Sequence, residues 1–157
     1  MTGCELIEGV PADLDEVMAT MELAFDPVFG EAWTRAQCVG ILCLDGVWLT
    51  LARVGGAPAG FALARVVADE AELLLLAVRP GWRGAGVGGA LLHSVEARAH
   101  ALGAARLHLE MREDNPAGAL YARHGFAQVG RRSRYYRGRD GRAYDAITLS
   151  HPLDLRE

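Results

Sequence analysis

The chain has few cysteines and no long apolar run, and each absence excludes a class of protein. Among its 157 residues, Cys4, Cys38 and Cys43 are odd in number and lack the paired spacing of a zinc site, which favours free thiols in a reducing compartment. No apolar run approaches the roughly 20 residues that a membrane span requires. The opening MTGCELIEG has neither the basic start nor the apolar stretch of a secretory signal. We therefore expect a cytoplasmic protein without membrane contact.

Two kinds of site are also missing from the sequence. The five histidines are scattered, and no H-E-x-x-H motif or close acidic cluster accompanies them, so no metal is predicted. No Gly-Lys dipeptide occurs, which excludes a P-loop. The length and a hydrophobic share of 51% are instead typical of one globular domain. We expect a single domain over residues 1–157.

Net positive charge is confined to one short segment. The formal net charge is −4, but residues 131–142 carry +5 and the remainder −9. The segment holds the arginines Arg131, Arg132, Arg134, Arg137, Arg139 and Arg142 and one acid, Asp140. The overall balance argues against nucleic-acid binding over the whole surface. The basic segment, interleaved with Tyr135 and Tyr136, leaves open a local RNA-binding surface or a solvated hairpin.

The apolar pattern predicts an alternation of helices and strands. Apolar residues from Leu14 to Phe25 recur at helical spacing after Asp13, which is a candidate helix cap. The run AELLLLAV at 71–78 is nearly continuous and predicts a strand at the centre of a sheet, buried on both faces. The other predicted helices are 34–42, 87–102 and 117–124, and the other strands are 47–54, 59–67, 105–112, a segment beginning at Gly125-Phe126, and 143–153. Antiparallel hairpins thus flank a central βαβ unit.

A glycine-rich loop joins the central strand to the following helix. Backbone N–H groups and the positive end of the helix dipole at such a junction favour a phosphate. Glycines let the ligand approach the backbone, and Arg83 adds a forked donor. Gly84, Gly86 and Gly89 also satisfy G-x-G-x-x-G, with Glu110 about 20 residues later. A dinucleotide fold is disfavoured, because too many residues separate these glycines from the strand and too few follow Glu110.

The stretch AVRPGWRGAGVGGALL resembles the acetyl-CoA loop of the GNAT N-acetyltransferases. Arg83, Gly86 and Gly88 occupy the three signature positions, and ALYARHGF is similar to the family's Leu-Tyr helix followed by Gly-Phe. The resemblance runs from about Glu70 to Leu153. The segments DEAELLLLAV, LHLEMRED and RYYRGRDGRAYDAITL are most like the ribosomal-protein-alanine N-acetyltransferase, or RimI-type, branch.

The resemblance implies an α/β fold whose central, mostly antiparallel mixed sheet splays between Leu73–Val78 and Ala105–Arg112, with flanking helices. It also implies acetyl-CoA as cosubstrate and an oxyanion donor among the backbone N–H groups near Val78. The residues expected to bind acetyl-CoA are Leu76, Ala77, Val78, Arg83, Gly84, Ala85, Gly86, Val87, Gly88, Gly89 and Asn115.

Two residues match the catalytic positions of the family. Glu110 corresponds to the base that takes the amine proton directly or through water, and Glu72 and His108 are alternatives. A structural alternative for Glu110 is a salt bridge to Arg112. Tyr121 matches the tyrosine near the CoA sulfur. Because a phenol near pKa 10 donates uphill to a thiolate near 8.5, hydrogen bonding is the larger expected role.

The acceptor follows from the branch and from the acidity of amines. An α-amine, with a pKa of about 7.7–8.0, is partly neutral at cell pH, whereas a lysine near 10.4 is almost wholly protonated. The resemblance implies a protein N-terminus, such as that of a ribosomal protein, covered by Tyr135 and Tyr136. Glu72 is a further candidate for substrate binding.

Glu22, Asp26 and Glu31 either attract a basic substrate or form a solvated face. The other acceptors left open are a polyamine, an aminoglycoside or a lysine side chain, and an RNA-binding module on a transferase fold is the remaining alternative.

Overall fold

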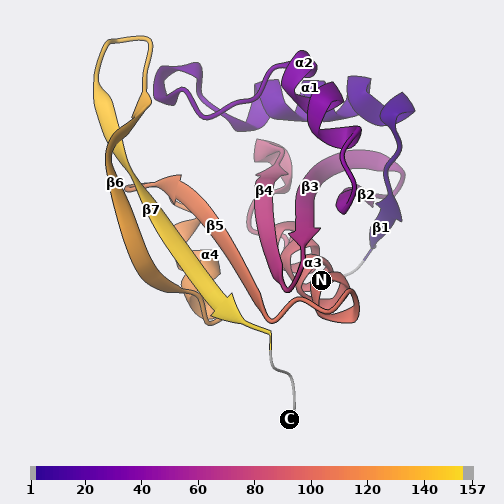
Figure 1. Ribbon diagram of the computed structural model, residues 1–157. Helices are drawn as coiled ribbons and strands as arrows, with labels where there is room; N and C mark the ends of the chain where they lie inside the picture. Colours follow the sequence, from indigo (N-terminus) through magenta and orange to yellow (C-terminus); the bar gives the residue numbers. More distant parts are fainter. Residues whose placement is uncertain (1–2, 154–157) are drawn as a thin grey trace.

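The computed structural model describes residues 3–153 and places a mixed sheet between helices (Figure 1). Within this range the strands are β1 (Cys4–Glu8), β2 (Val47–Val54), β3 (Ala57–Val67), β4 (Glu70–Val78), β5 (Arg106–Arg112), β6 (Ala127–Arg137) and β7 (Ala143–Pro152). The helices are α1 (Leu14–Ala24), α2 (Arg35–Leu42), α3 (Val87–Ala101) and α4 (Gly118–Arg123), with 3-10 turns at Pro11–Asp13, Pro27–Phe29 and Pro80–Trp82. No helix in the described part of the chain is long and apolar enough to cross a membrane.

The sheet is antiparallel except at its centre. Its strand order is β1-β2-β3-β4-β5-β7-β6, so β4 is the middle strand, as the apolar run predicts. The strands β4 and β5 are parallel, and they pair only from Glu70 opposite Arg106 to Glu72 opposite His108. Beyond that point they diverge, which opens the sheet in the upper half of Figure 1. The predicted splayed, mostly antiparallel sheet is confirmed.

Two apolar cores cover the two faces of the sheet. On one face, Leu91, Leu92 and Val95 of α3 are fully buried against the strands, and Tyr121 of α4 belongs to the same core. On the other face, Val17 and Met21 of α1 pack on the sheet, together with residues of α2. This arrangement follows from helical spacing, which puts the apolar side chains of each helix on one stripe.

A β-bulge in β4 changes which residues face each core. Leu73 lies opposite Ala64, but Leu75 lies opposite Leu63, so Leu74 is the extra residue of the bulge. Leu73 therefore packs on the α3 side and Leu75 on the α1 side. Both faces of β4 are covered, as predicted, although its residues alternate between buried and half-buried because β5 departs on one side.

The sequence prediction misses one strand and misassigns one cap. The five-residue strand β1 pairs with β2 alone at the sheet edge, and its alternation is too short to register in the sequence. Asp13 precedes α1 but does not cap it, because its carboxylate accepts from the Val10 amide at 2.9 Å and closes the preceding 3-10 turn. At α2, Thr34 and Gln37 form a reciprocal capping box.

A buried carboxylate on α3 makes stability depend on pH. Oε2 of Glu96 has no hydrogen-bond partner among residues 3–153, and His151 Nε2 lies 3.7 Å away. Burial raises the pKa of Glu96, and the nearby imidazoles of His151, His124 and His93 oppose that shift. Since the folded pKa is raised, the carboxyl's contribution to stability is complete below its unfolded pKa and is lost as the pH rises through the folded pKa.

We therefore predict that Glu96→Gln gains stability relative to the natural chain as the pH rises. Glutamine cannot ionise, and removing a buried carboxylate charge that the imidazoles offset less as they lose their protons is expected to gain about 1 kcal/mol, or about 2–4 °C in Tm for a chain of this size. Thermal unfolding at pH 5 and pH 8 measures the difference, with Glu22→Gln on the exposed face of α1 as control. A Tm difference that stays constant between the two pH values would contradict the prediction.

Candidate active site

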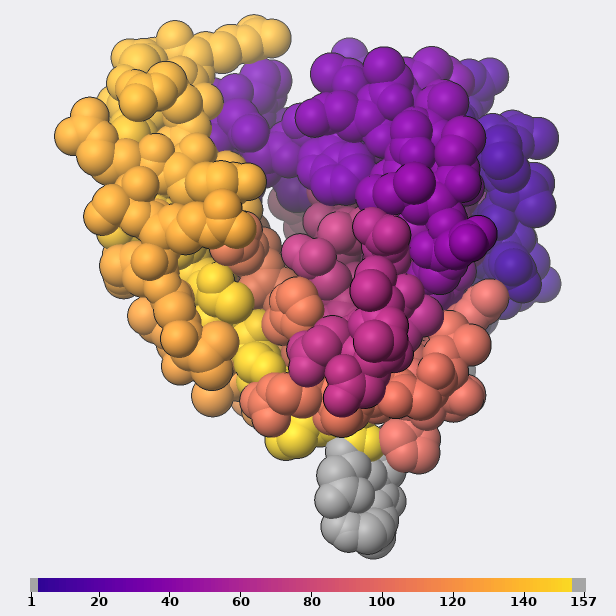
Figure 2. Space-filling model, viewed as in Figure 1, coloured from indigo at the N-terminus to yellow at the C-terminus, as the bar shows by residue number. Residues whose placement is uncertain are grey.

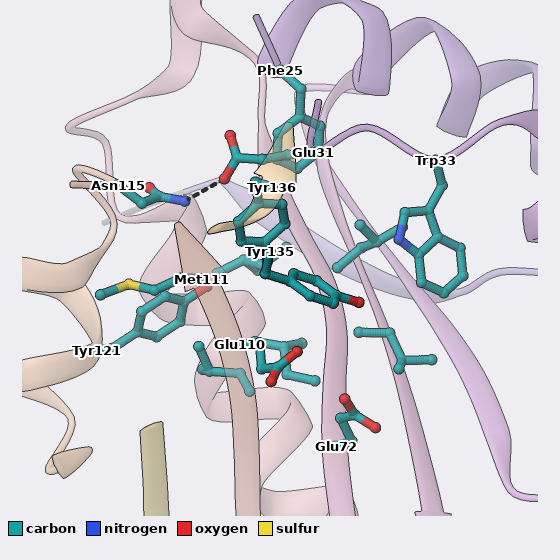
Figure 3. Close-up of a pocket in the computed structure, with 15 residues that line it drawn as sticks. Phe25, Glu31, Trp33, Glu72, Glu110, Met111, Asn115, Tyr121, Tyr135 and Tyr136 are labelled. Atoms are coloured by element: carbon teal, nitrogen blue, oxygen red, sulfur yellow. Dashed lines mark hydrogen bonds between the residues drawn. The ribbon is translucent and has the colours of Figure 1, made fainter. Parts of the chain in front are cut away.

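A cavity of about 190 Å³ lies where β4 and β5 separate (Figures 2 and 3). Figure 2 shows the hollow between the β6–β7 hairpin, in orange and yellow, and the purple and magenta half of the molecule. The lining combines carboxylates, aromatic rings and apolar strand residues: Glu31, Glu72, Glu110, Phe25, Trp33, Tyr121, Tyr135, Tyr136, Leu73, Leu74, Leu75, Leu76, Leu109, Met111 and Asn115. Most of the residues predicted for catalysis and acceptor binding therefore meet in one place.

The diverging half of β4 offers free backbone groups to this cavity. Arg79 donates its amide to Ala59 of β3, and the pairing of Phe61 with Ala77 continues that ladder. Because neighbouring residues of a strand direct their amides to opposite sides, the amides of Leu76 and Val78 point away from β3. They face the gap toward β5, where the resemblance places the pantetheine arm and the oxyanion donor.

The glycine loop ends at the amino terminus of α3. Gly84 and Gly86 have φ angles of 80° and 87°, a left-handed conformation that other residues rarely adopt. Gly86 is the residue before the first turn of α3, whose first amides have no acceptor inside the helix. Ala85 through Gly89 thus surround a helix terminus suited to an anion.

The side chain of Arg83 has a different environment from the one expected of a phosphate ligand. Its guanidinium donates to the carbonyl oxygens of Val78 at 3.2 Å and Ala24 at 2.9 Å. Arg83 thereby ties the glycine loop to the end of α1. In this conformation its side chain supports the loop, and the loop amides remain the groups available to an anion.

Glu110 lies on β5 with one carboxylate oxygen engaged and the other free. Oε2 accepts from Arg132 Nε at 2.8 Å and from Thr148 Oγ1 at 3.3 Å. Oε1 accepts no hydrogen bond from any residue in the range 3–153. The side chain is 19% exposed and lines the cavity. The ion-pair partner is thus Arg132 of β6 and not Arg112, because Arg112 is turned toward Glu31 and Asp114.

Tyr121 projects from the short helix α4 into the cavity (Figure 3). Its ring packs edge-on against Phe126 at a centroid distance of 5.7 Å, and the residue is almost fully buried. Burial raises the pKa of Tyr121 far above its usual range, and the charge of Glu31 adds to the effect. The phenol therefore stays protonated at neutral pH.

Glu31 is not part of a solvated face, contrary to one of the sequence interpretations. Its side chain is 10% exposed and lines the cavity, whereas Glu22 and Asp26 are both exposed and lie outside it. Oε2 of Glu31 accepts from Asn115 Nδ2 at 3.3 Å, and Oε1 lies 3.5 Å from Arg112 Nε (Figure 3). The side-chain oxygen of Asn115 in turn accepts from the Ala117 amide before α4.

The α1–α2 connection meets the tip of the β6–β7 hairpin and closes one end of the cavity. Phe29 packs edge-on against Tyr144 at 5.4 Å, and the guanidinium of Arg112 lies 3.7 Å from the Phe29 ring centre. Both sides of this contact come close at the top of Figure 1. Glu31 and Trp33 follow Phe29 on the same connection, so these contacts hold them at the cavity. Sequence reasoning did not identify Glu31 and Trp33 as cavity residues, because only the folded chain brings this connection to the cavity.

Tyr135 and Tyr136 cover the cavity from β6. A break in the β6–β7 register between Arg132 and Tyr136 contains Arg134, whose φ is 55°. The two tyrosine rings pack edge-on at 5.1 Å, and Arg132 lies 4.6 Å from the Tyr135 ring centre. Burial, followed by the charges of Glu31 and Glu110, raises the pKa of Tyr136 to about 12. Both predicted acceptor residues thus lie on the cavity.

The remaining candidates are divided between the cavity and its surroundings. Glu72 lines the cavity, but His108 lies outside it with Nε2 3.9 Å from Glu70. Arg131 forms an ion pair with Asp145 at 2.6 Å. The hydrogen bond from the Arg134 amide, followed by this contact with Arg131, lowers the pKa of Asp145. No cluster of metal-ligating side chains occurs within residues 3–153.

Comparison with known proteins gives the family. The model of the acetyltransferase (GNAT) family matches residues 14–126. The chain belongs to the GNAT acetyltransferase family. As a GNAT enzyme it is an acetyl-CoA-dependent N-acetyltransferase, with acetyl-CoA as its cosubstrate. The open edge of β4 and the glycine-rich terminus of α3 fit that cosubstrate, since they offer backbone donors to an extended amide chain and to phosphates.

Relatives named for a particular activity place this GNAT chain more closely within the family. It is 41% identical over 101 residues to [ribosomal protein bS18]-alanine N-acetyltransferase of Escherichia coli, covering 64% of this chain and 68% of that protein. It is also 41% identical over 101 residues to N-alpha-acetyltransferase RimI of Mycobacterium tuberculosis, covering 59% and 60%. The crystal structure of the E. coli ribosomal-protein-S18-alanine enzyme superposes with a TM-score of 0.87 at 28% identity over 98% and 96% of the chains. The predicted resemblance to the RimI-type branch is confirmed.

Proposed function

We propose that this enzyme acetylates the N-terminal α-amine of a protein, and that a ribosomal protein is its acceptor. The main support for this proposal is that Glu110 and Tyr121 both line one cavity at the diverging strands. Relatives that match the chain are named [ribosomal protein bS18]-alanine N-acetyltransferase and N-alpha-acetyltransferase RimI, which supports the same acceptor class here.

The proposed cosubstrate site follows the glycine loop and β4. The amides from Gly84 to Gly89 bind the pyrophosphate at the α3 terminus, and the backbone of Leu76 to Val78 binds the pantetheine arm. Arg83 stabilises the loop by donating a hydrogen bond to the carbonyl oxygen of Ala24 at the end of α1. Asn115 contributes by fixing the start of α4 and hence the position of Tyr121. Acetyl-CoA supplies a thioester carbonyl that an amine attacks, with loss of the thiolate.

The chain's own residues handle the two protons. Glu110 presents Oε1 to the cavity, while Arg132 and Thr148 fix Oε2, so the carboxylate is oriented to accept a proton from the amine directly or through water. Tyr121 keeps its proton because burial raises the pKa of the phenol. It therefore serves the departing thiolate by donating a hydrogen bond. The amide of Val78 faces the gap and is the proposed oxyanion donor.

Thiol release from acetyl-CoA tests the acceptor class. Three acceptors are compared: a peptide with a free N-terminal alanine, its N-blocked copy that keeps internal lysines, and spermidine. We expect release with the free peptide alone, because an α-amine is partly neutral near pH 7.5 and a lysine amine is not. Preference for spermidine or the blocked peptide would overturn the proposed acceptor and leave the acetyltransferase activity in place.

A further inference from the structure

The cavity lining is acidic and contains no cationic side chain. Glu31, Glu72 and Glu110 line it, and no arginine is among the lining residues. Of these carboxylates, Glu110 is paired with Arg132, and Glu72 has no ion-pair partner within residues 3–153. An uncompensated carboxylate in a recessed site attracts cations.

The third carboxylate, Glu31, is also incompletely neutralised. Its cationic neighbour Arg112 is shared with Asp114, to which Arg112 Nη1 donates a hydrogen bond. Two carboxylates thus divide one guanidinium. When Asp114, which lies outside the cavity lining, is counted with the three cavity carboxylates, four negative charges face the two positive charges of Arg112 and Arg132. The ammonium group of an incoming acceptor supplies one positive charge, which leaves the second carboxylate uncompensated.

The contacts of Glu31 are long on both carboxylate oxygens. Asn115 Nδ2 donates to Oε2 at 3.3 Å, and Oε1 forms an ion pair with Arg112 Nε at 3.5 Å. The Glu31 side chain is nine-tenths buried, and burial raises its pKa. A buried carboxylate interacts more strongly with a nearby cation than a solvated one does, because the effective dielectric around it is lower.

Glu31 is separated from the proposed base. Figure 3 shows Glu31 at one end of the cavity and Glu72 and Glu110 toward the other, with Tyr135 and Tyr136 between them. An acceptor with its amine at Glu110 must pass these rings to reach Glu31. Aromatic rings tolerate a cationic side chain across their faces. The path suits an extended peptide whose second charge lies beyond its N-terminus.

We propose that Glu31 binds the side chain of a basic residue close to the N-terminus of the acceptor, so that the enzyme selects basic N-terminal sequences. This inference rests on the proposed function, since it takes the acceptor to be a polypeptide N-terminus. Glu31 is a specificity-determining residue in this scheme. The chemistry at the thioester does not require it.

Peptides that differ only in charge test the proposal. Each has a free N-terminal alanine and carries either arginine or citrulline, its neutral isostere, at the second, third or fourth position. For at least one position we expect kcat/KM to be about tenfold higher with arginine. In Glu31→Gln that ratio falls close to one, whereas in Glu22→Gln, which changes an exposed carboxylate on α1, it is unchanged.

A second variant controls for loss of stability. In Glu31→Gln the buried guanidinium of Arg112 keeps only Asp114 as an ion-pair partner, which could destabilise the fold. Glu31→Asp keeps the charge beside Arg112 and withdraws the carboxylate by one methylene. We expect a lower arginine-to-citrulline ratio in this variant, with a Tm close to that of the natural chain. The ratio in the natural enzyme also falls with added salt, as screening predicts.

The outcomes separate this inference from the proposed function. If no peptide is acetylated and spermidine is, the proposed function fails. Equal turnover of arginine and citrulline peptides at every position would overturn the selectivity while the acceptor class stands. A ratio abolished by Glu72→Gln and kept by Glu31→Gln would assign the selectivity to Glu72 and overturn the role of Glu31.

Discussion

Replacing Glu110 by glutamine is expected to lower kcat/KM for peptide acetylation by about a hundredfold to ten-thousandfold, the usual contribution of a positioned general base. Glutamine keeps the shape of the side chain but cannot take the amine proton at Oε1. Thr148 and Arg132 still have an amide oxygen to donate to, and Arg132 is more than half exposed. Steady-state kinetics with the alanine peptide measure the loss, and thermal unfolding checks that the fold is intact.

The matched control for Glu110 is Glu113→Gln. Glu113 also pairs with an arginine of β6, since Arg131 Nη1 lies 3.4 Å from its carboxylate, but it does not line the cavity. Its activity is expected to stay near that of the natural enzyme. Retained activity in Glu110→Gln together with a large loss in Glu72→Gln would move the base to Glu72, the other cavity carboxylate on the facing strand.

Replacing Tyr121 by phenylalanine is expected to lower kcat by about ten- to a hundredfold. A hydrogen bond to a charged group contributes about 1.5–3 kcal/mol, and each 1.36 kcal/mol is about tenfold in rate. The ring still packs against Phe126, so the fold is preserved. Single-turnover thiol release measures the effect, because it isolates the step in which the thiolate departs.

The pH profile distinguishes a hydrogen-bonding phenol from one that titrates during turnover. Burial raises the pKa of Tyr121, so the protonated form is present throughout an assay between pH 6 and pH 9.5. Any basic limb of the natural profile must therefore persist in Tyr121→Phe. Tyr144→Phe, which alters a tyrosine packed on Phe29 outside the cavity lining, serves as the control. Disappearance of the limb in Tyr121→Phe alone would contradict this role.

Much of the fold is readable from the sequence because its signals are local. The continuous apolar run of β4, the glycines around Gly86 and the helical spacing of α3 each depend on neighbours in the chain. The same locality places Glu110 at a strand end and Tyr121 on a short helix. The edge strand β1 escapes prediction, since five residues paired with one neighbour carry little periodicity.

The partners of the charged side chains were decided only by the tertiary structure. Arg132 meets Glu110 because β6 and β5 both pair with β7, and Arg112 meets Glu31 because the α1–α2 connection contacts the hairpin tip. These pairs join residues 22 and 81 positions apart along the chain. No local pattern encodes such contacts, so the sequence alone determined the fold, the glycine loop and two catalytic candidates, whereas the folded chain decided that Glu31 faces the cavity.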